Sequence, residues 1–176
     1  MRKLSAEEMN RKSKEDFKAS TKYPITVVLD NIRSALNVGS IFRTADAFLI
    51  EEIIICGISP QPPHKEIYKT ALGSTESVNW KYLENSLDAV QDLKEKGYQV
   101  FAIEQTQNSI FLHQFELENH AKIAIVFGNE VSGVEQEVID ICHGVIEIEQ
   151  KGTKHSLNVA VTAGIVIWEL HKKMNT

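Results

Sequence analysis

Short apolar runs alternate with segments of helical periodicity along most of the chain. The apolar, β-branched runs predict strands at residues 25–29, 53–56, 98–103, 123–127 and 145–148. Apolar positions three and four residues apart predict helices at residues 38–48, 86–96, 134–141 and 156–172. This alternation predicts an α/β fold in which helices cover a mostly parallel sheet.

Two stretches interrupt the alternation. Residues 58–65 contain three prolines and are predicted to be irregular, and residues 70–80 are predicted to be a loop with a short strand. The last predicted helix, 156–172, is apolar nearly all round, unlike an ordinary surface helix. We therefore expect part of this helix to contact another subunit.

The length of 176 residues and the 43% hydrophobic content fit one well-packed domain. We predict an N-terminal arm at residues 1–22 and a single domain at residues 23–176, because no repeat or linker marks a second module. No apolar run approaches the roughly 18 residues of a membrane span, and the first residues lack the apolar core of a signal peptide. We expect a cytoplasmic protein.

The charge distribution is uneven. A formal charge of −5 and a pI near 5.7 count against a protein that coats itself in nucleic acid. Residues 1–22, however, hold seven basic and four acidic side chains. A solvated helix, a loose terminus and a phosphate-contacting arm all fit this composition, and the alternatives stay open.

Cysteine and histidine positions point away from a metal site. Cys56 and Cys142 lie far apart in apolar stretches, which predicts buried free thiols. The six histidines form no H-E-x-x-H motif and no Cys/His cluster with zinc spacing. We predict no metal.

Three polar loops follow predicted strands, at residues 104–106, 128–133 and 150–156, and the second and third contain glycine. Ligands of open parallel sheets bind beyond the carboxyl ends of strands, so we expect these loops to meet at one cleft. No G-x-G-x-x-G or phosphate-loop motif is present. A plain strand–helix turn capped by Asn129 or Ser132 is the alternative for the second loop, and local turn chemistry alone favours that interpretation.

Arg43 lies about 140° from the apolar face of its predicted helix, so its side chain is expected to point away from the core. It follows the first predicted strand together with Asn31, Arg33 and Asn37. Such a polar group fits an anionic substrate, and it also fits ordinary solvated surface.

Three ordered motifs resemble one family. Residues 31–46 (NIRSALNVGSIFRTAD), 127–134 (FGNEVSGV) and 146–161 (IEIEQKGTKHSLNVAV) resemble the first, second and third motifs of the SpoU-type, TrmH-like branch of the SPOUT RNA 2′-O-ribose methyltransferases. Residues 69–74 and 103–106 are similar to the tRNA guanosine 2′-O-methyltransferase subgroup. One departure is Glu149, which stands where the family usually has proline, whose fixed backbone is therefore missing.

The resemblance implies a SPOUT fold with a C-terminal trefoil knot, a homodimer with its active site at the subunit interface, and S-adenosylmethionine as cofactor. Together with the loops at the strand ends, it implies the following cofactor-binding residues: Glu104, Gln105, Thr106, Gly128, Asn129, Gly133, Ile148, Gln150, Gly152, Ser156 and Leu157. The implied catalytic residues are Arg43, Asn37, Glu130, Ser156 and Asn158.

The family proposal makes the Arg43 equivalent the general base. A guanidinium with a pKa above about 12 scarcely loses its proton. We therefore interpret Arg43 as a stabiliser of alkoxide and phosphate charge, oriented by Glu130, Asn37 and Asn158.

The resemblance implies RNA methylation on a guanosine of tRNA, in the D-loop. Because no repeat or linker marks a second module, we expect no fused RNA-binding domain. Ribosomal RNA is the first alternative substrate. A catalytically silent RNA-binding or assembly factor of the same fold is a second alternative, and an unrelated α/β enzyme for a small anionic metabolite is a third.

Overall fold

The structure is a computed structural model that describes residues 1–5, 7–118 and 121–175. Within these residues the strands are β1 (Tyr23–Asp30), β2 (Ile50–Cys56), β3 (Asn79–Leu83), β4 (Tyr98–Ile103), β5 (Ile110–Phe111), β6 (Lys122–Phe127) and β7 (Gly144–Glu147). The helices are α1 (Lys14–Ala19), α2 (Ala35–Ala47), α3 (Lys65–Ala71), the 3₁₀ turn η1 (Ser74–Glu76), α4 (Ser86–Glu95), α5 (Gln136–Ile141) and α6 (Val159–Met174).

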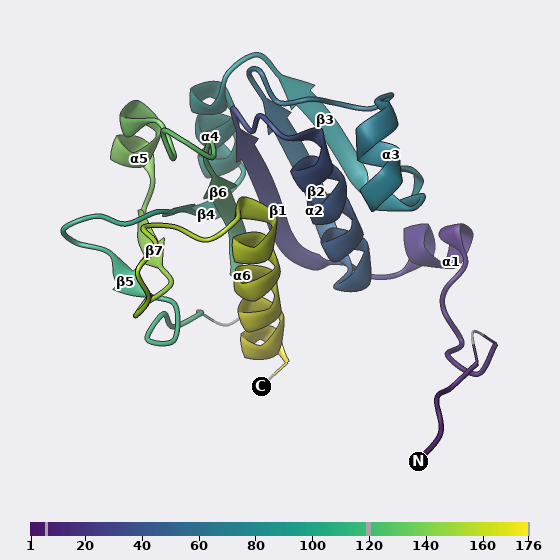
Figure 1. Cartoon of the computed structure of the whole chain (residues 1–176). Helices are drawn as coiled ribbons and strands as arrows, with labels where there is room; N and C mark the ends of the chain where they lie inside the picture. The colour runs from purple at the N-terminus through teal and green to yellow at the C-terminus, as the bar shows by residue number, and fades with distance from the viewer. Residues whose placement is uncertain (6, 119–120, 176) are drawn as a thin grey trace.

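The strands described form one sheet in the order β3-β2-β1-β6-β4-β7-β5, and every adjacent pair of strands is parallel (Figure 1). The predicted α/β fold with a mostly parallel sheet is confirmed. The two central strands, β1 and β6, are far apart in sequence, so the sheet unites the two halves of the chain. No helix among the described residues is long and apolar enough to cross a membrane.

Both faces of the sheet are covered. Val27 and Leu29 of β1 point into a core shared with α1, α2, α3 and α6, whereas Val28 points into a second core with α4 and α5. Burial on both faces explains why the central strands read as continuous apolar runs rather than alternating ones. In Figure 1, α2 and α6 run side by side across the first face.

Side-chain caps fix the starts of α4 and α6. Asn85 accepts a hydrogen bond from the Asp88 amide at the start of α4, and Gly97 closes that helix with a φ of +81°. The last helix begins at Val159 rather than at Ser156. The reason is Asn158, whose Oδ1 accepts from the amides of Ala160 and Val161 and so sets the N-terminus there.

Several local predictions were wrong. Residues 65–71 form α3, because His64 accepts from the Glu66 amide and so caps a helix that the mixed pattern concealed. α5 begins at Gln136, two residues later than predicted. Cys56 is buried as expected, but Cys142 is partly exposed.

Within the predicted arm, α1 docks onto the core through its buried Phe17. The division into arm and domain stays a prediction.

Candidate functional site

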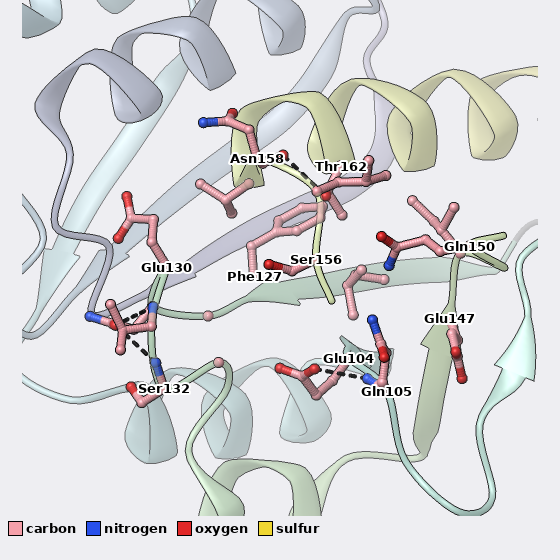
Figure 2. A pocket seen from close by; sticks show the side chains of 18 residues that line it. Glu104, Gln105, Phe127, Glu130, Ser132, Glu147, Gln150, Ser156, Asn158 and Thr162 are labelled. Atoms are coloured by element: carbon pink, nitrogen blue, oxygen red, sulfur yellow. Dashed lines mark hydrogen bonds between the residues drawn. The ribbon is translucent and has the colours of Figure 1, made fainter. Parts of the chain in front are cut away.

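A cavity of about 460 Å³ opens where the carboxyl ends of β4, β6 and β7 meet the N-terminus of α6 (Figure 2). In the figure, Glu104 and Gln105 after β4 face Asn158 and Thr162 of the α6 end across this cavity. The three loops expected at one cleft therefore do converge. Eleven residues predicted from the sequence line it: Glu104, Gln105, Gly128, Asn129, Glu130, Gly133, Ile148, Gln150, Ser156, Leu157 and Asn158.

The loop after β6 is closed by its own backbone. Asn129 and Gly133 exchange two backbone hydrogen bonds of 3.0 and 2.9 Å. The Asn129 Oδ1 accepts from the amides of Val131 and Ser132, so it caps this loop and not the helix that follows. A Cβ on Gly128 would lie 2.1 Å from the backbone of Gly133, so the turn requires glycine there.

Glu104 supports the same loop from the neighbouring strand. Its carboxylate accepts from the Gln105 amide at 2.8 Å and from the Val134 amide at 3.3 Å. A Cβ on Gly133 would meet the Glu104 carboxylate at 2.2 Å, and the Gly133 φ of +73° independently favours glycine. Gln105 in turn donates to the His155 carbonyl oxygen at 2.7 Å, which ties the loop before α6 to the end of β4.

A second network of hydrogen bonds connects the first family-like motif, residues 31–46, to the second, residues 127–134. Asn31 has a φ of 55°, and its side-chain Nδ2 donates to Asp30 at 3.0 Å and to Glu135 at 2.8 Å. The Asn31 carbonyl oxygen accepts from the Asn129 side chain at 2.7 Å. Asp30 is fully buried and also accepts from the Glu135 amide and the Ser86 hydroxyl. The negative charge of Asp30 raises the pKa of Glu135, and burial adds to that effect.

Glu130 joins three segments at the mouth of the cavity. Its carboxylate accepts from the amides of Arg33 and Ser34 and from the Asn37 side chain, at 2.8, 3.1 and 2.8 Å. Asn37 accepts from the Asn158 side chain at 3.1 Å. Burial opposes ionisation of Glu130, but the hydrogen bonds from Arg33, Asn37 and Ser34 outweigh it and hold its pKa below the usual value.

Three predicted site residues lie elsewhere. Arg43 is exposed and lines a separate groove between α2 and α3, and among the described residues it forms no hydrogen bond or ion pair with Glu130. Thr106 lines a neighbouring cavity beside β7, and Gly152 lies outside the described cavity lining. Glu149, at the usual proline position, forms an exposed ion pair with Lys151 at 3.5 Å.

Seven lining residues were not predicted from the sequence: Ile103, Phe127, Val131, Ser132, Glu147, Val159 and Thr162. Ile103 and Phe127 are the last residues of β4 and β6, so their position at strand ends was an available signal. Glu147 lacked this signal, because it lay inside the predicted strand 145–148 and not at its end. Its side chain accepts from the Ser109 hydroxyl, which links β7 to the loop before β5.

The cavity carries a distinct charge pattern. Three carboxylates line it, from Glu104, Glu130 and Glu147, and no lysine, arginine or histidine is among the described residues of its lining. Uncharged polar side chains such as Gln150 and Thr162, together with apolar ones that include Phe127 and Leu157, supply most of the remaining wall. An elongated ligand with a positive centre and an apolar ring would complement this lining.

The histidines do not converge on a cluster in the part of the chain that the structure describes, where no group of three His, Cys, Asp or Glu side chains could hold a metal ion. His120 lies outside the described residues. The absence of a metal stays a prediction.

Comparison with protein families identifies the class. The model of the SpoU rRNA methylase family matches residues 24–168, so the chain belongs to this family. Two relatives are described as members of the TrmH family of tRNA/rRNA methyltransferases. The one from Staphylococcus saprophyticus is 27% identical over 158 residues, which cover 90% of this chain and 62% of the relative. The one from Staphylococcus aureus strain COL is 30% identical over 147 residues, 84% of this chain and 58% of the relative. The chain thus spans about 60% of the length of these curated relatives.

Solved structures share the fold. The TrmH/SpoU tRNA modifying enzyme of A. aeolicus superposes with a TM-score of 0.80 at 25% identity, covering 92% of this chain and 80% of that one. An AdoMet-bound rRNA methyltransferase from Sinorhizobium meliloti gives a TM-score of 0.79 at 26% identity, covering 89% and 59%. These similarities confirm the resemblance to the SpoU-type branch and the SPOUT fold class.

Proposed function

We propose that this protein is an S-adenosylmethionine-dependent RNA methyltransferase that modifies a ribose 2′-hydroxyl. The observation that carries this proposal is the bonded chain Asn158–Asn37–Glu130, which joins the three family motifs at the mouth of one cavity. The cavity behind it supplies a place for a methyl donor, and the open mouth leaves an approach for a large acceptor.

The residues present fit S-adenosylmethionine. This cofactor carries a sulfonium and an ammonium against one carboxylate, so a lining with three carboxylates and no cation among its described residues is complementary to its net charge. The volume of about 460 Å³ lies within the range of about 300–1,000 Å³ typical of small-molecule sites. Bound there, the cofactor would supply an electrophilic methyl group. Glu104, Gly128, Ile148, Ser156 and Leu157 would hold it.

The acceptor hydroxyl must be aligned with the methyl group and must lose a proton. Asn37 and Glu130 would orient the ribose end of the site, with Ser156 close by in the same cavity. A guanidinium is a poor base, so the proposed role of Arg43 is to stabilise the charge of the alkoxide and the adjacent phosphate.

Within one chain Arg43 lines a different groove from the cavity, which favours its contribution from a second chain. We therefore propose a homodimer whose active site combines Arg43 of one protomer with the cavity of its partner. The outer face of α6 supports this: Val161, Ile165 and Trp168 are 52%, 39% and 50% exposed. We also propose that the chain forms a trefoil knot around the loop before α6. The proposed location is the cytoplasm.

Within this reaction class we propose a guanosine of the tRNA D-loop as the acceptor. Support comes from residues 69–74 and 103–106 and from the likeness to the A. aeolicus tRNA modifying enzyme. Ribosomal RNA is the second candidate, because the Sinorhizobium meliloti relative is an rRNA methyltransferase. A silent RNA-binding factor is the third.

The test incubates purified protein with methyl-labelled S-adenosylmethionine and, separately, unmodified tRNA and ribosomal RNA, and identifies labelled nucleosides after digestion. Labelled 2′-O-methylguanosine from tRNA supports the full proposal. A labelled 2′-O-methyl nucleoside from ribosomal RNA alone refutes tRNA as the acceptor and supports ribose methylation as the reaction. Base methylation refutes the ribose assignment, and cofactor binding without label on any RNA favours the silent factor.

A further inference from the structure

The groove that contains Arg43 lies beside a close crossing of α2 and α3. A Cβ on Gly39 would lie 2.2 Å from the Thr70 Oγ1 and 2.3 Å from the Ile67 carbonyl oxygen, so the two helices meet backbone to backbone. The Thr70 hydroxyl donates to the Leu36 carbonyl oxygen at 2.9 Å and locks the crossing. This packing fixes Lys69 of α3 beside Arg43 of α2, in one groove.

The charge of this groove is positive and is not compensated within it. Arg43 and Lys69 line it, and no carboxylate is among its described lining residues. The hydroxyls of Ser40, Thr44 and Thr70 donate to helix carbonyl oxygens. Lys69 has one exposed carboxylate neighbour outside the groove, Glu66 at 3.8 Å, and such an exposed pair is weak. Two adjacent cations in a protein of net charge −5 indicate an anionic ligand.

The outer face of α3 extends the groove with an aromatic side chain. Lys65, Tyr68, Lys69 and Leu72 follow one another at i, i+3, i+4 and i+7, so they form one stripe. Tyr68 and Leu72 are 47% and 65% exposed. The other three tyrosines of the chain donate hydroxyl hydrogen bonds, whereas among the described residues Tyr68 has none. A solvent-facing ring between two lysines suits an unpaired base and its flanking phosphates.

Resting on the proposed function, we infer that this α3 stripe and the Arg43 groove bind an unpaired stretch of the RNA next to the acceptor nucleotide. Lys69 and Arg43 contact a phosphate, and Tyr68 stacks on a base. The distribution of charge agrees with this assignment. Residues 1–76, which include α1, α2 and α3, hold eleven basic and ten acidic side chains, whereas residues 77–176 hold eight and fourteen.

The test measures binding of two fluorescent RNA probes, a hairpin with an unpaired loop and a blunt duplex, to the full chain at several salt concentrations. Lys69→Ala should weaken hairpin binding several-fold and reduce the slope of log affinity against log salt by about 0.7. Lys96→Ala is the matched control, because α4 packs on the opposite face of the sheet and Lys96 pairs with Asp92. Equal effects of the two substitutions would overturn the assignment.

The aromatic contact has its own pair of variants. Tyr68→Ala should weaken hairpin binding about tenfold and leave duplex binding unchanged, whereas Tyr68→Phe, which keeps the ring, should stay within about twofold. A change in sedimentation of Tyr68→Ala would instead make this face a contact between chains and overturn the inference. Neither measurement needs methyl transfer, so its outcome is separate from that of the proposed reaction.

Discussion

The side-chain amide of Asn129 donates to the backbone carbonyl oxygen of Asn31 over 2.7 Å, which connects the loop after β6 to the end of β1. The same side chain caps its own loop through Oδ1, which accepts from Val131 and Ser132. One residue therefore shapes the wall of the cavity with its oxygen and positions it against the first motif with its nitrogen.

These two functions can be separated by substitution. Asn129→Asp keeps the accepting oxygen and loses the donor, whereas Asn129→Ala loses both. We expect the alanine variant to bind S-adenosylmethionine at least tenfold more weakly, since two loop amides lose their partner, and the aspartate variant to fall between alanine and wild type. Isothermal titration calorimetry measures the affinities, and equal losses in both variants would contradict a separate role for the loop cap.

Gly128→Ala should abolish binding of the same cofactor and lower the free energy of unfolding by about 1–3 kcal/mol, because the new Cβ overlaps the backbone of Gly133. Gly144→Ala is the control, as its Cβ would lie at an ordinary 3.5 Å from the Phe101 ring. Urea unfolding and calorimetry report the two quantities. A Gly128→Ala variant that binds normally would show that the turn can relax.

Arg43→Ala should abolish methyl transfer and leave the affinity for S-adenosylmethionine within a few-fold, because Arg43 lies outside the cavity. If protomers share sites, mixing Arg43→Ala with Gly128→Ala should restore about a quarter of wild-type activity, since half of the random dimers then hold one intact site. No recovery after exchange of subunits would place both residues in the same chain's site, contrary to the proposed dimer.

Asp30→Asn should lower the pKa of Glu135, because the negative charge of Asp30 is the main cause that raises it. In the wild type the raised pKa means that ionised Glu135 costs stability above its folded pKa, and that this cost disappears as the pH falls through that value. Carboxyl NMR titration measures the shift. An unchanged Glu135 pKa would assign its elevation to burial, the second cause, instead.

Local patterns predicted β1, β2, β4, β6 and β7, because burial on both faces of a parallel sheet leaves continuous apolar runs such as 123–127. The two-residue strand β5 was not predicted. They failed at α3, whose seven residues mix polar and apolar side chains and whose cap is a histidine rather than a common capping residue. The order of the strands was also beyond local pattern, since β1 pairs with β6 through contacts about a hundred residues apart.

The candidate site was likewise predictable from the sequence only in part. Residues in the loops after strands were identified because such loops converge in parallel sheets, as Glu104 and Gly128 do. The hydrogen-bond partners of Glu130 were only partly predictable. The sequence indicated Asn37, but two of the three hydrogen bonds that Glu130 accepts come from backbone amides, which no side-chain motif encodes. The separation of Arg43 from the cavity likewise depends on tertiary packing.

The central position of β6 has a consequence for biosynthesis. β1 gains its second neighbour only when Lys122–Phe127 has left the ribosome, and β4 gains its second when Gly144–Glu147 follows. Until then the nascent chain exposes the apolar edge of β1, a state in which parallel sheets fold slowly and aggregate readily. Cotranslational folding of this protein should therefore be delayed until most of the chain is synthesised, and chaperone dependence should peak just before β6 emerges.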